Sequence, residues 1–120
     1  MKFHAKFFDG LTAGEIYEIL KSRAEIFIKE QGIHYVDPDD VDYESLHIFG
    51  EENGRVIAYL RAYRADEDSV KIGRVLTLYH GQGIGTELMK FALKEISERM
   101  PCKKIIMDAQ KHAVAFYKRL

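Results

Sequence analysis

The sequence predicts an α/β domain in which a mixed, mostly antiparallel β-sheet is flanked by helices and carries one parallel strand pair. The first observation is the order strand, glycine-rich loop and helix over residues 75–100, because a crossover of this kind joins parallel strands. The second is segment 55–64, which has apolar side chains on both faces, as expected of a central strand covered on two sides. The third is the element order β-α-β-β-β-α-β-α along the whole chain.

Composition indicates a single globular domain over residues 1–120. The 18 basic and 19 acidic residues give a net charge of −1, which favours neither nucleic acid nor an anionic membrane as a partner. No apolar run has the roughly 18–20 residues that a membrane span needs. Cys102 is the single cysteine and forms no internal disulfide, so we expect a cytoplasmic protein, with a homodimer left open.

Local patterns place the individual elements. Residues 2–8 are rich in aromatic side chains and alternate loosely, which predicts a strand at or near a sheet edge. Thr12 and Glu15 form a capping-box pattern, and an apolar stripe then predicts a helix to about Glu30, ended by Gly32. The remaining elements are predicted as strands at 46–50, 55–64, 70–78 and 103–109, an Asn-Gly hairpin turn at 53–54, and helices at 84–100 and 110–120.

An acidic segment at residues 33–43 is predicted to be a loop. Five carboxylates fall within the eight positions 37–44, in this segment and just after it: Asp37, Asp39, Asp40, Asp42 and Glu44. The spacing lacks the glycine and the terminal glutamate of an EF-hand calcium loop. Two interpretations stay open: a solvated acidic loop, or an acidic rim that attracts a cationic amine.

The stretch His80-Gly81-Gln82-Gly83-Ile84-Gly85-Thr86 predicts an anion site. Alternating glycines allow a tight turn and a close approach of a ligand to the backbone, and a helix start presents free N–H groups to an anion. The stretch does not match the dinucleotide fingerprint, since its third glycine comes one residue early, and it lacks the lysine of a Walker loop. From the local pattern alone, a strand-to-helix turn without a ligand is the alternative.

Several segments together resemble the GNAT superfamily of acyl-CoA-dependent N-acetyltransferases, and within it the ElaA-like group. The likeness covers nearly the whole chain and depends on the order and spacing of its pieces. These pieces are the helix segment 23–31, Tyr35 with the acidic stretch 37–42, Ile72-Gly73-Arg74-Val75, Asp108-Ala109-Gln110, and Phe116-Tyr117.

The resemblance implies transfer of an acetyl group from acetyl-CoA to a primary amine of a small molecule or peptide, by direct attack in a ternary complex and without a metal. The cofactor motif of the family, [QR]-x-x-G-x-[GA], maps onto His80, Gly83 and Gly85. A catalytically weak or inactive acyl-CoA-binding module of the same fold is the alternative. The cofactor-binding residues that the resemblance implies are Leu76, Thr77, Leu78, His80, Gly81, Gln82, Gly83, Ile84, Gly85, Thr86 and Gln110.

The resemblance also suggests catalytic roles. Tyr117 falls at the position of the family's usual proton donor to the CoA thiolate, although an aromatic side chain at helical spacing is also typical of a core. A backbone N–H near Leu76 or Thr77 would stabilise the oxyanion. His47 is a candidate base or a hydrogen-bonded sheet residue, and Glu44 a candidate base, amine anchor or surface residue.

Two departures from the family bear on function. His80 stands where the family has Arg or Gln, so the affinity for the diphosphate would depend on pH near neutrality. The chain ends at Leu120, whereas the family continues into two further strands, so we expect a domain that lacks its C-terminal strands.

Arg23 is expected to be a buried ion-pair residue, with a contact to the acceptor substrate as the alternative.

Overall fold

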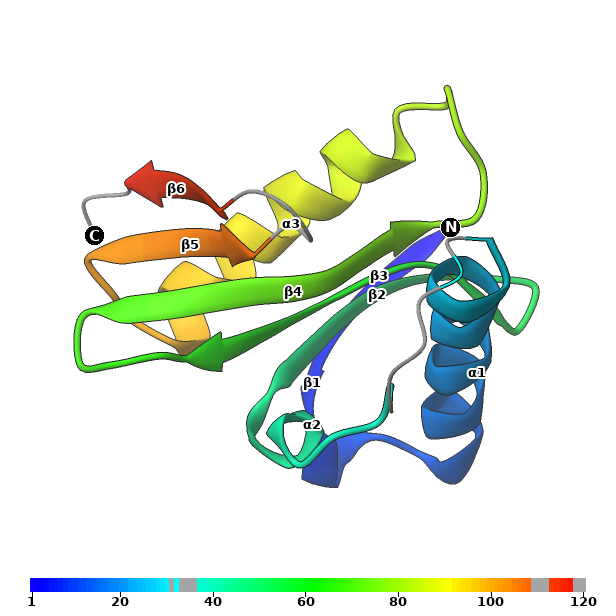
Figure 1. The fold of residues 1–120 in the computed structure, drawn as a ribbon, viewed down its shortest axis with the longest axis horizontal. Helices are drawn as coiled ribbons and strands as arrows, with labels where there is room; N and C mark the ends of the chain where they lie inside the picture. Colours follow the sequence, from blue (N-terminus) through cyan, green and yellow to red (C-terminus); the bar gives the residue numbers. More distant parts are fainter. Residues whose placement is uncertain (31, 33–36, 109–112, 118–120) are drawn as a thin grey trace.

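The computed structural model describes residues 1–30, 32, 37–108 and 113–117, which form one sheet with helices on both of its faces (Figure 1). None of the helices in these ranges combines the length and the hydrophobicity that a membrane span requires. In chain order the elements are β1 (Lys2–Phe7), the short η1 helix (Phe8–Gly10), α1 (Ala13–Arg23), the π-helix η2 (Ala24–Glu30), α2 (Val41–Glu44), β2 (Leu46–Glu52), β3 (Arg55–Arg64), β4 (Ser69–Thr77), α3 (Ile84–Arg99), β5 (Lys104–Asp108) and β6 (Ala113–Tyr117).

The sheet confirms the predicted fold class. Its strands lie in the order β1-β2-β3-β4-β5-β6, and every neighbouring pair is antiparallel except β4 and β5, which are parallel and joined by α3. Strand β1 is an edge strand, as its sequence predicts. Strand β3 lies in the interior of the sheet, which agrees with the apolar side chains on both of its faces.

The two faces of the sheet carry separate cores, because successive side chains of a strand point to opposite sides. Ile48 and Leu60 pack with the apolar stripe of α3 on one face. Phe49 and Tyr59, the adjacent residues, pack with α1 and η2 on the other face. Figure 1 shows α3 on one side of the sheet and α1 and α2 on the opposite side.

Two local predictions from side-chain chemistry are confirmed. The Thr12 hydroxyl accepts a hydrogen bond from the Glu15 amide at 3.0 Å, and the Glu15 carboxylate accepts one from the Thr12 amide at 2.8 Å. The turn between β2 and β3 has positive φ angles at Asn53 (54°) and Gly54 (77°), the pair that a two-residue hairpin turn of type I′ requires. The helix predicted to run to about Glu30 does so, with π-helical geometry after Arg23.

The helix predicted at 110–120 is wrong for the part of that segment that the structure describes. Ala113–Tyr117 form β6, antiparallel to β5, with Tyr117 opposite Lys104. The sequence Ala-Val-Ala-Phe-Tyr is compatible with both periodicities, and a strand here pairs the backbone groups that β5 would otherwise leave open at its edge. Gln110 lies outside the described residues.

The acidic segment also differs from its predicted loop. Val41–Glu44 form the one-turn helix α2, and the Asp37 and Asp42 side chains are buried, with 4% and 8% of their residue surface exposed. The prediction of a solvated acidic segment is therefore wrong for these two carboxylates.

Candidate functional site

The glycine stretch forms an open turn between β4 and α3. Gly81 and Gly83 have φ angles of 76° and 72°, in the left-handed region that favours glycine. Apart from the glycine itself and its two chain neighbours, the described residues place no atom within 4 Å of where a Cβ would stand at either position. Gly83 is the N-cap of the 16-residue helix α3, and no side chain caps this helix start. The first amides of α3, from Ile84 onward, therefore face the turn without intrahelical partners.

Strand β4 carries a β-bulge just before this turn. Tyr59 of β3 pairs with Leu76, and Arg61 pairs with Gly73, so β4 has one residue more than β3 between these two pairs. Within the bulge, Arg74 has a φ of 54°, which is unusual for a residue with a side chain. The bulge twists the end of β4 relative to its neighbour.

The outer edge of β4 opens beyond the bulge. Pairing with β5 ends at Ile72, and in the described part of the chain no strand pairs with this side of residues 73–77. The Leu78 amide donates to the Ile57 carbonyl at 2.8 Å, so it faces β3. Because amide directions alternate along a strand, the Leu76 amide also faces β3, and the Thr77 amide faces the open edge.

A buried guanidinium group anchors the acidic segment to α1. Arg23 has no exposed surface, and its Nε donates to the Asp37 carboxylate at 2.9 Å, while its Nη1 donates to the Asp42 carboxylate at 2.8 Å. Its Nη2 also donates to the Asp37 carbonyl oxygen at 2.8 Å. Arg23 is therefore a structural ion-pair residue, as the sequence favours.

Two more arginines extend this cluster into the sheet. Arg61 of β3 donates to Asp39 at 2.6 Å and to Asp42 at 2.9 Å. Arg74 of the bulge donates to Asp37 at 3.0 Å, and its Nη2 lies 3.4 Å from an Asp39 carboxylate oxygen. We call Arg23, Arg61, Arg74, Asp37, Asp39 and Asp42 the arginine–aspartate cluster; its three positive and three negative charges balance.

The cluster shifts the pKa values of its carboxyl groups. Burial alone would raise the pKa of Asp42, but the hydrogen bonds and charges of Arg23 and Arg61 lower it below its ordinary value. The hydrogen bond from Arg61 is the main cause of the lowered pKa of Asp39. Both groups therefore remain ionised at acidic pH values where an isolated aspartate begins to protonate.

His47 is a hydrogen-bonded sheet residue whose two ring nitrogens both have partners. Its Nε2 lies 2.8 Å from the Asp42 carbonyl oxygen, which only accepts, so Nε2 carries the proton. Its Nδ1 then accepts from the Tyr59 hydroxyl at 2.7 Å. Burial lowers the pKa of His47, which favours the neutral ring, and burial raises the pKa of Tyr59, which favours the protonated phenol.

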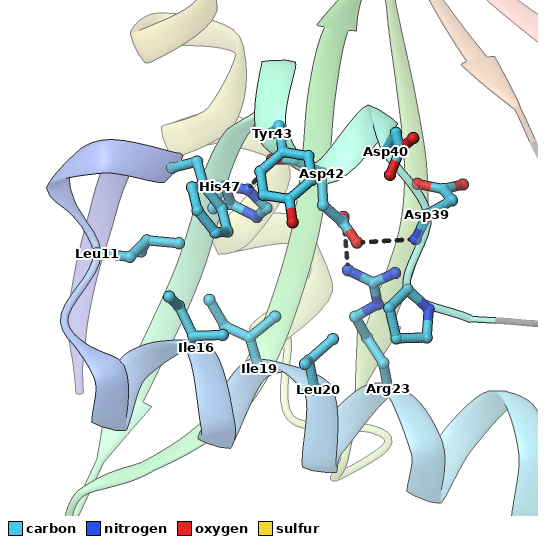
Figure 2. Close-up of a pocket in the computed structure, with 12 residues that line it drawn as sticks. Leu11, Ile16, Ile19, Leu20, Arg23, Asp39, Asp40, Asp42, Tyr43 and His47 are labelled. Carbon is cyan, nitrogen blue, oxygen red and sulfur yellow. Dashed lines mark hydrogen bonds and ion pairs between the residues drawn. The ribbon is translucent and has the colours of Figure 1, made fainter.

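A cavity of about 260 Å³ lies between α1, η1 and α2, on the face of the sheet opposite α3 (Figure 2). Arg23, Asp42 and His47 form its inner polar wall, and Asp39 and Asp40 stand on the acidic segment beside it. Its apolar lining consists of Phe8, Leu11, Ile16, Ile19, Leu20 and Pro38, together with the ring of Tyr43.

The structure brings some predicted site residues together and separates others. Leu76, Thr77 and Leu78 lead directly into the turn that holds the glycines, and a Cβ added at Gly85 would come within 3.9 Å of the Thr77 side chain. His80 and Glu44 are both exposed, His80 before α3 and Glu44 at the end of α2. Tyr117 belongs to β6, and its partner Lys104 pairs with Ser69 at the start of β4, so its backbone lies at the end of the sheet away from the glycine turn (Figure 1).

Comparison with known proteins decides the family. A sequence model of the Acetyltransferase (GNAT) family matches residues 14–120. The chain belongs to this GNAT family. Protein ElaA of Escherichia coli K12 is 33% identical over 113 residues, which cover 89% of this chain and 74% of that protein.

Solved GNAT-related structures agree with the fold. The crystal structure of an acyl-CoA N-acyltransferase from Pseudomonas aeruginosa has a TM-score of 0.84 at 32% identity and covers 92% of this chain and 80% of its own. The crystal structure of E. coli ElaA has a TM-score of 0.85 at 29% identity, and the match covers 92% of this chain and 79% of the ElaA chain. A GNAT acetyltransferase from Elizabethkingia anophelis, solved with acetyl-CoA bound, shares the fold alone, with a TM-score of 0.58 at 15% identity and coverage of 88% and 63%.

In the described ranges of this GNAT protein, no group of three or more His, Cys, Asp or Glu side chains is arranged to hold a metal ion. Three carboxylates of the acidic segment, Asp37, Asp39 and Asp42, are held by the arginines. Local sequence patterns did not predict the cluster, since Arg61 and Arg74 lie on strands far along the chain from their acidic partners. The one indication in the sequence was Arg61, an arginine at an inward-facing position of a central strand.

The first prediction concerns Arg23. Arg23→Ala removes the fully buried partner of Asp37 and Asp42 and leaves Arg74 and Arg61 as their remaining partners, so we expect a loss of about 3 kcal/mol in the free energy of unfolding. Urea unfolding followed by circular dichroism measures it. Arg99→Ala is the matched control, because its side chain is 46% exposed and pairs with Glu95 on the surface of α3, and it should change stability by less than about 0.5 kcal/mol. Equal effects of the two variants would contradict the anchoring role of Arg23.

The second prediction concerns the pH dependence of stability. The pKa of His47 is lower in the folded chain than its ordinary value of 6.5, so the unfolded state binds the proton first and stability falls as the pH drops below about 6.5. The lowered pKa values of Asp39 and Asp42 cause a further loss below their ordinary 3.8. Urea unfolding between pH 3 and 8 measures both steps. His47→Gln should remove the first step and keep the second; an unchanged first step would show that His47 does not cause it.

Proposed function

We propose that this chain transfers the acetyl group of acetyl-CoA to a primary amine of a small molecule or peptide, by direct attack of the amine on the thioester. The observation that carries the proposal is the open edge of β4, which runs without interruption into the glycine turn and the start of α3. Family membership and the acetyl-CoA-bound relative of the same fold support it.

The chain's own groups fit a diphosphate at the glycine turn. A Cβ at Gly81 or Gly83 would meet no neighbour, so the space above the turn is open, and the amides at the start of α3 point into it. These amides, with those of the turn, would hold the diphosphate of acetyl-CoA. The positive end of the α3 dipole favours the negative charge there.

The open edge of β4 fits the thioester end. The Thr77 amide faces this edge and would donate to the thioester carbonyl oxygen as negative charge develops on it. The Leu76 and Leu78 amides face β3, so these two residues would contribute their carbonyl oxygens and side chains. Of the two backbone donors that the sequence offers for the oxyanion, the alternation of amide directions therefore supports Thr77.

The amine needs to lose a proton, and the chain offers two candidate bases. His47 would accept one only by giving up its hydrogen bond from Tyr59, because the Nε2 proton is already donated to the Asp42 carbonyl oxygen. Glu44 is exposed and reachable from solvent. We keep both as candidates, with Glu44 favoured by access.

A non-catalytic acyl-CoA-binding module is the second candidate, and one observation favours it. Tyr117, the proposed proton donor to the thiolate, has its backbone at the end of the sheet away from the glycine turn. Without a donor near the turn, thiolate departure would depend on water, and turnover would be slow.

The third prediction tests cofactor binding and turnover together. Acetyl-CoA at 100 times its dissociation constant should stabilise the chain by about 2.7 kcal/mol, and a panel of primary amines should release free CoA. Gly83→Ala should weaken both effects, because a side chain at a φ of 72° strains the turn that holds the diphosphate.

Gly54→Ala is the matched control, since it places the same strain, at a φ of 77°, in the hairpin turn between β2 and β3. Thermal unfolding with and without acetyl-CoA, and a thiol assay for CoA, provide the measurements. Stabilisation by acetyl-CoA without CoA release from any amine would favour the binding module. The absence of both effects would reject acyl-CoA as the ligand.

The fourth prediction addresses Tyr117. If its hydroxyl protonates the thiolate, Tyr117→Phe should lower kcat by about 100-fold at neutral pH with little change in KM. Tyr17→Phe, an exposed tyrosine on α1, is the control and should leave kcat unchanged. Steady-state CoA release across pH 6–10 is the measurement, and equal kcat values for Tyr117→Phe and the native chain at every pH would remove Tyr117 from the mechanism.

A further inference from the structure

We propose that the cavity between α1, η1 and α2 binds the apolar body of the acceptor, and that the acceptor is therefore a primary amine carrying an alkyl or aryl group. This inference rests on the proposed acetyltransferase function, because it assigns the acceptor to a site of the same protein. It commits to a small organic ammonium compound rather than to a peptide segment.

The size and lining of the cavity support an apolar body. Its volume of about 260 Å³ exceeds the roughly 150 Å³ that is sufficient for a benzene ring in a protein interior. Ile16, Ile19 and Leu20 of α1 form an aliphatic floor, and Leu11 closes one end (Figure 2). An aryl ring with a two-carbon linker matches these dimensions and this surface.

The negative charge beside the cavity supports the binding of an ammonium group. Within the arginine–aspartate cluster the charges balance, so the cluster adds no net attraction for a cation. Asp40 also lines the cavity, and among the described residues its carboxylate has no hydrogen-bond or ion-pair partner. The net negative charge beside the cavity therefore comes from Asp40.

Two aromatic rings line the same cavity as Asp40. Phe8 and Tyr43 both line the cavity, with ring centroids 4.8 Å apart in an edge-to-face arrangement. An aromatic ring face attracts an organic cation, so these rings add to the effect of the carboxylate in the same cavity. The aliphatic floor, the aromatic rings and the Asp40 carboxylate together favour an amine with an apolar substituent over both small amines and neutral analogues.

The cavity adjoins the strand that would hold the thioester. Asp39 lines the cavity and also lies within ion-pair distance of Arg74, the bulge residue of β4. The contact between Asp39 and Arg74 thereby connects the cavity to the bulge. An amine held beside Asp39 would therefore lie next to a side chain that contacts the bulge of β4.

The experiment separates binding from turnover. Calorimetry on the native chain without CoA compares 2-phenylethylamine with its neutral analogue 2-phenylethanol and with methylamine. We expect 2-phenylethylamine to bind about fivefold more tightly than 2-phenylethanol, since an exposed ion pair contributes up to about 1 kcal/mol, and methylamine to show no binding. Asp40→Asn should abolish the difference between the amine and the alcohol, whereas Asp9→Asn, at an exposed acid of η1 next to Phe8, should preserve it.

Ile16→Trp fills the cavity and supplies the second test. With acetyl-CoA present, it should lower kcat/KM for 2-phenylethylamine at least tenfold, while an unchanged thermal stabilisation by acetyl-CoA shows that the fold and cofactor site are intact. Equal kcat/KM values for methylamine and 2-phenylethylamine, both unaffected by Ile16→Trp, would overturn the cavity as the acceptor site and leave acetyl transfer standing. If the proposed acetyltransferase function is wrong, no amine of the panel releases CoA. That result would overturn the acceptor role of the cavity together with the function.

Discussion

The buried guanidinium of Arg23 is the interaction on which this site depends. A fully buried charge is tolerated only when its donors are paired, and Arg23 uses the Asp37 and Asp42 carboxylates and the Asp37 carbonyl oxygen for this purpose. The acidic segment must therefore lie over the C-terminal end of α1 whenever the chain is folded. That position in turn creates the cavity, because α2 is held at a fixed distance from the aliphatic face of α1.

The same carboxylates reach the strand that would hold the cofactor. Arg74 is the bulge residue with a positive φ, a conformation that costs free energy unless the surroundings hold it. Its hydrogen bonds to Asp37 supply such restraint from a segment 37 residues away. The shape of the open β4 edge and the position of the acidic segment are thus set by one charge-balanced cluster, which links the two sides of the proposed reaction.

Elements defined by local chemistry could be predicted from the sequence, and those defined by distant partners could not. The capping box of α1, the Asn-Gly turn and the apolar stripe of α3 each depend on residues within a few positions of one another. The arginine–aspartate cluster joins residues 14 to 37 positions apart, so no local pattern reveals it. Segment 113–117 carries both periodicities, and pairing with β5, a tertiary effect, decides for the strand.

The cluster also changes what an acidic segment means for function. Five carboxylates in eight positions suggest a strongly negative rim, yet three of them neutralise buried or half-buried arginines and are unavailable to a ligand. In the proposed acceptor site, attraction of a cationic amine would then depend on Asp40. A weak charge beside an apolar cavity discriminates by the apolar part of the ligand more than by its charge, because each buried methylene contributes about 0.8 kcal/mol. Selectivity among amines should accordingly follow the size of the substituent.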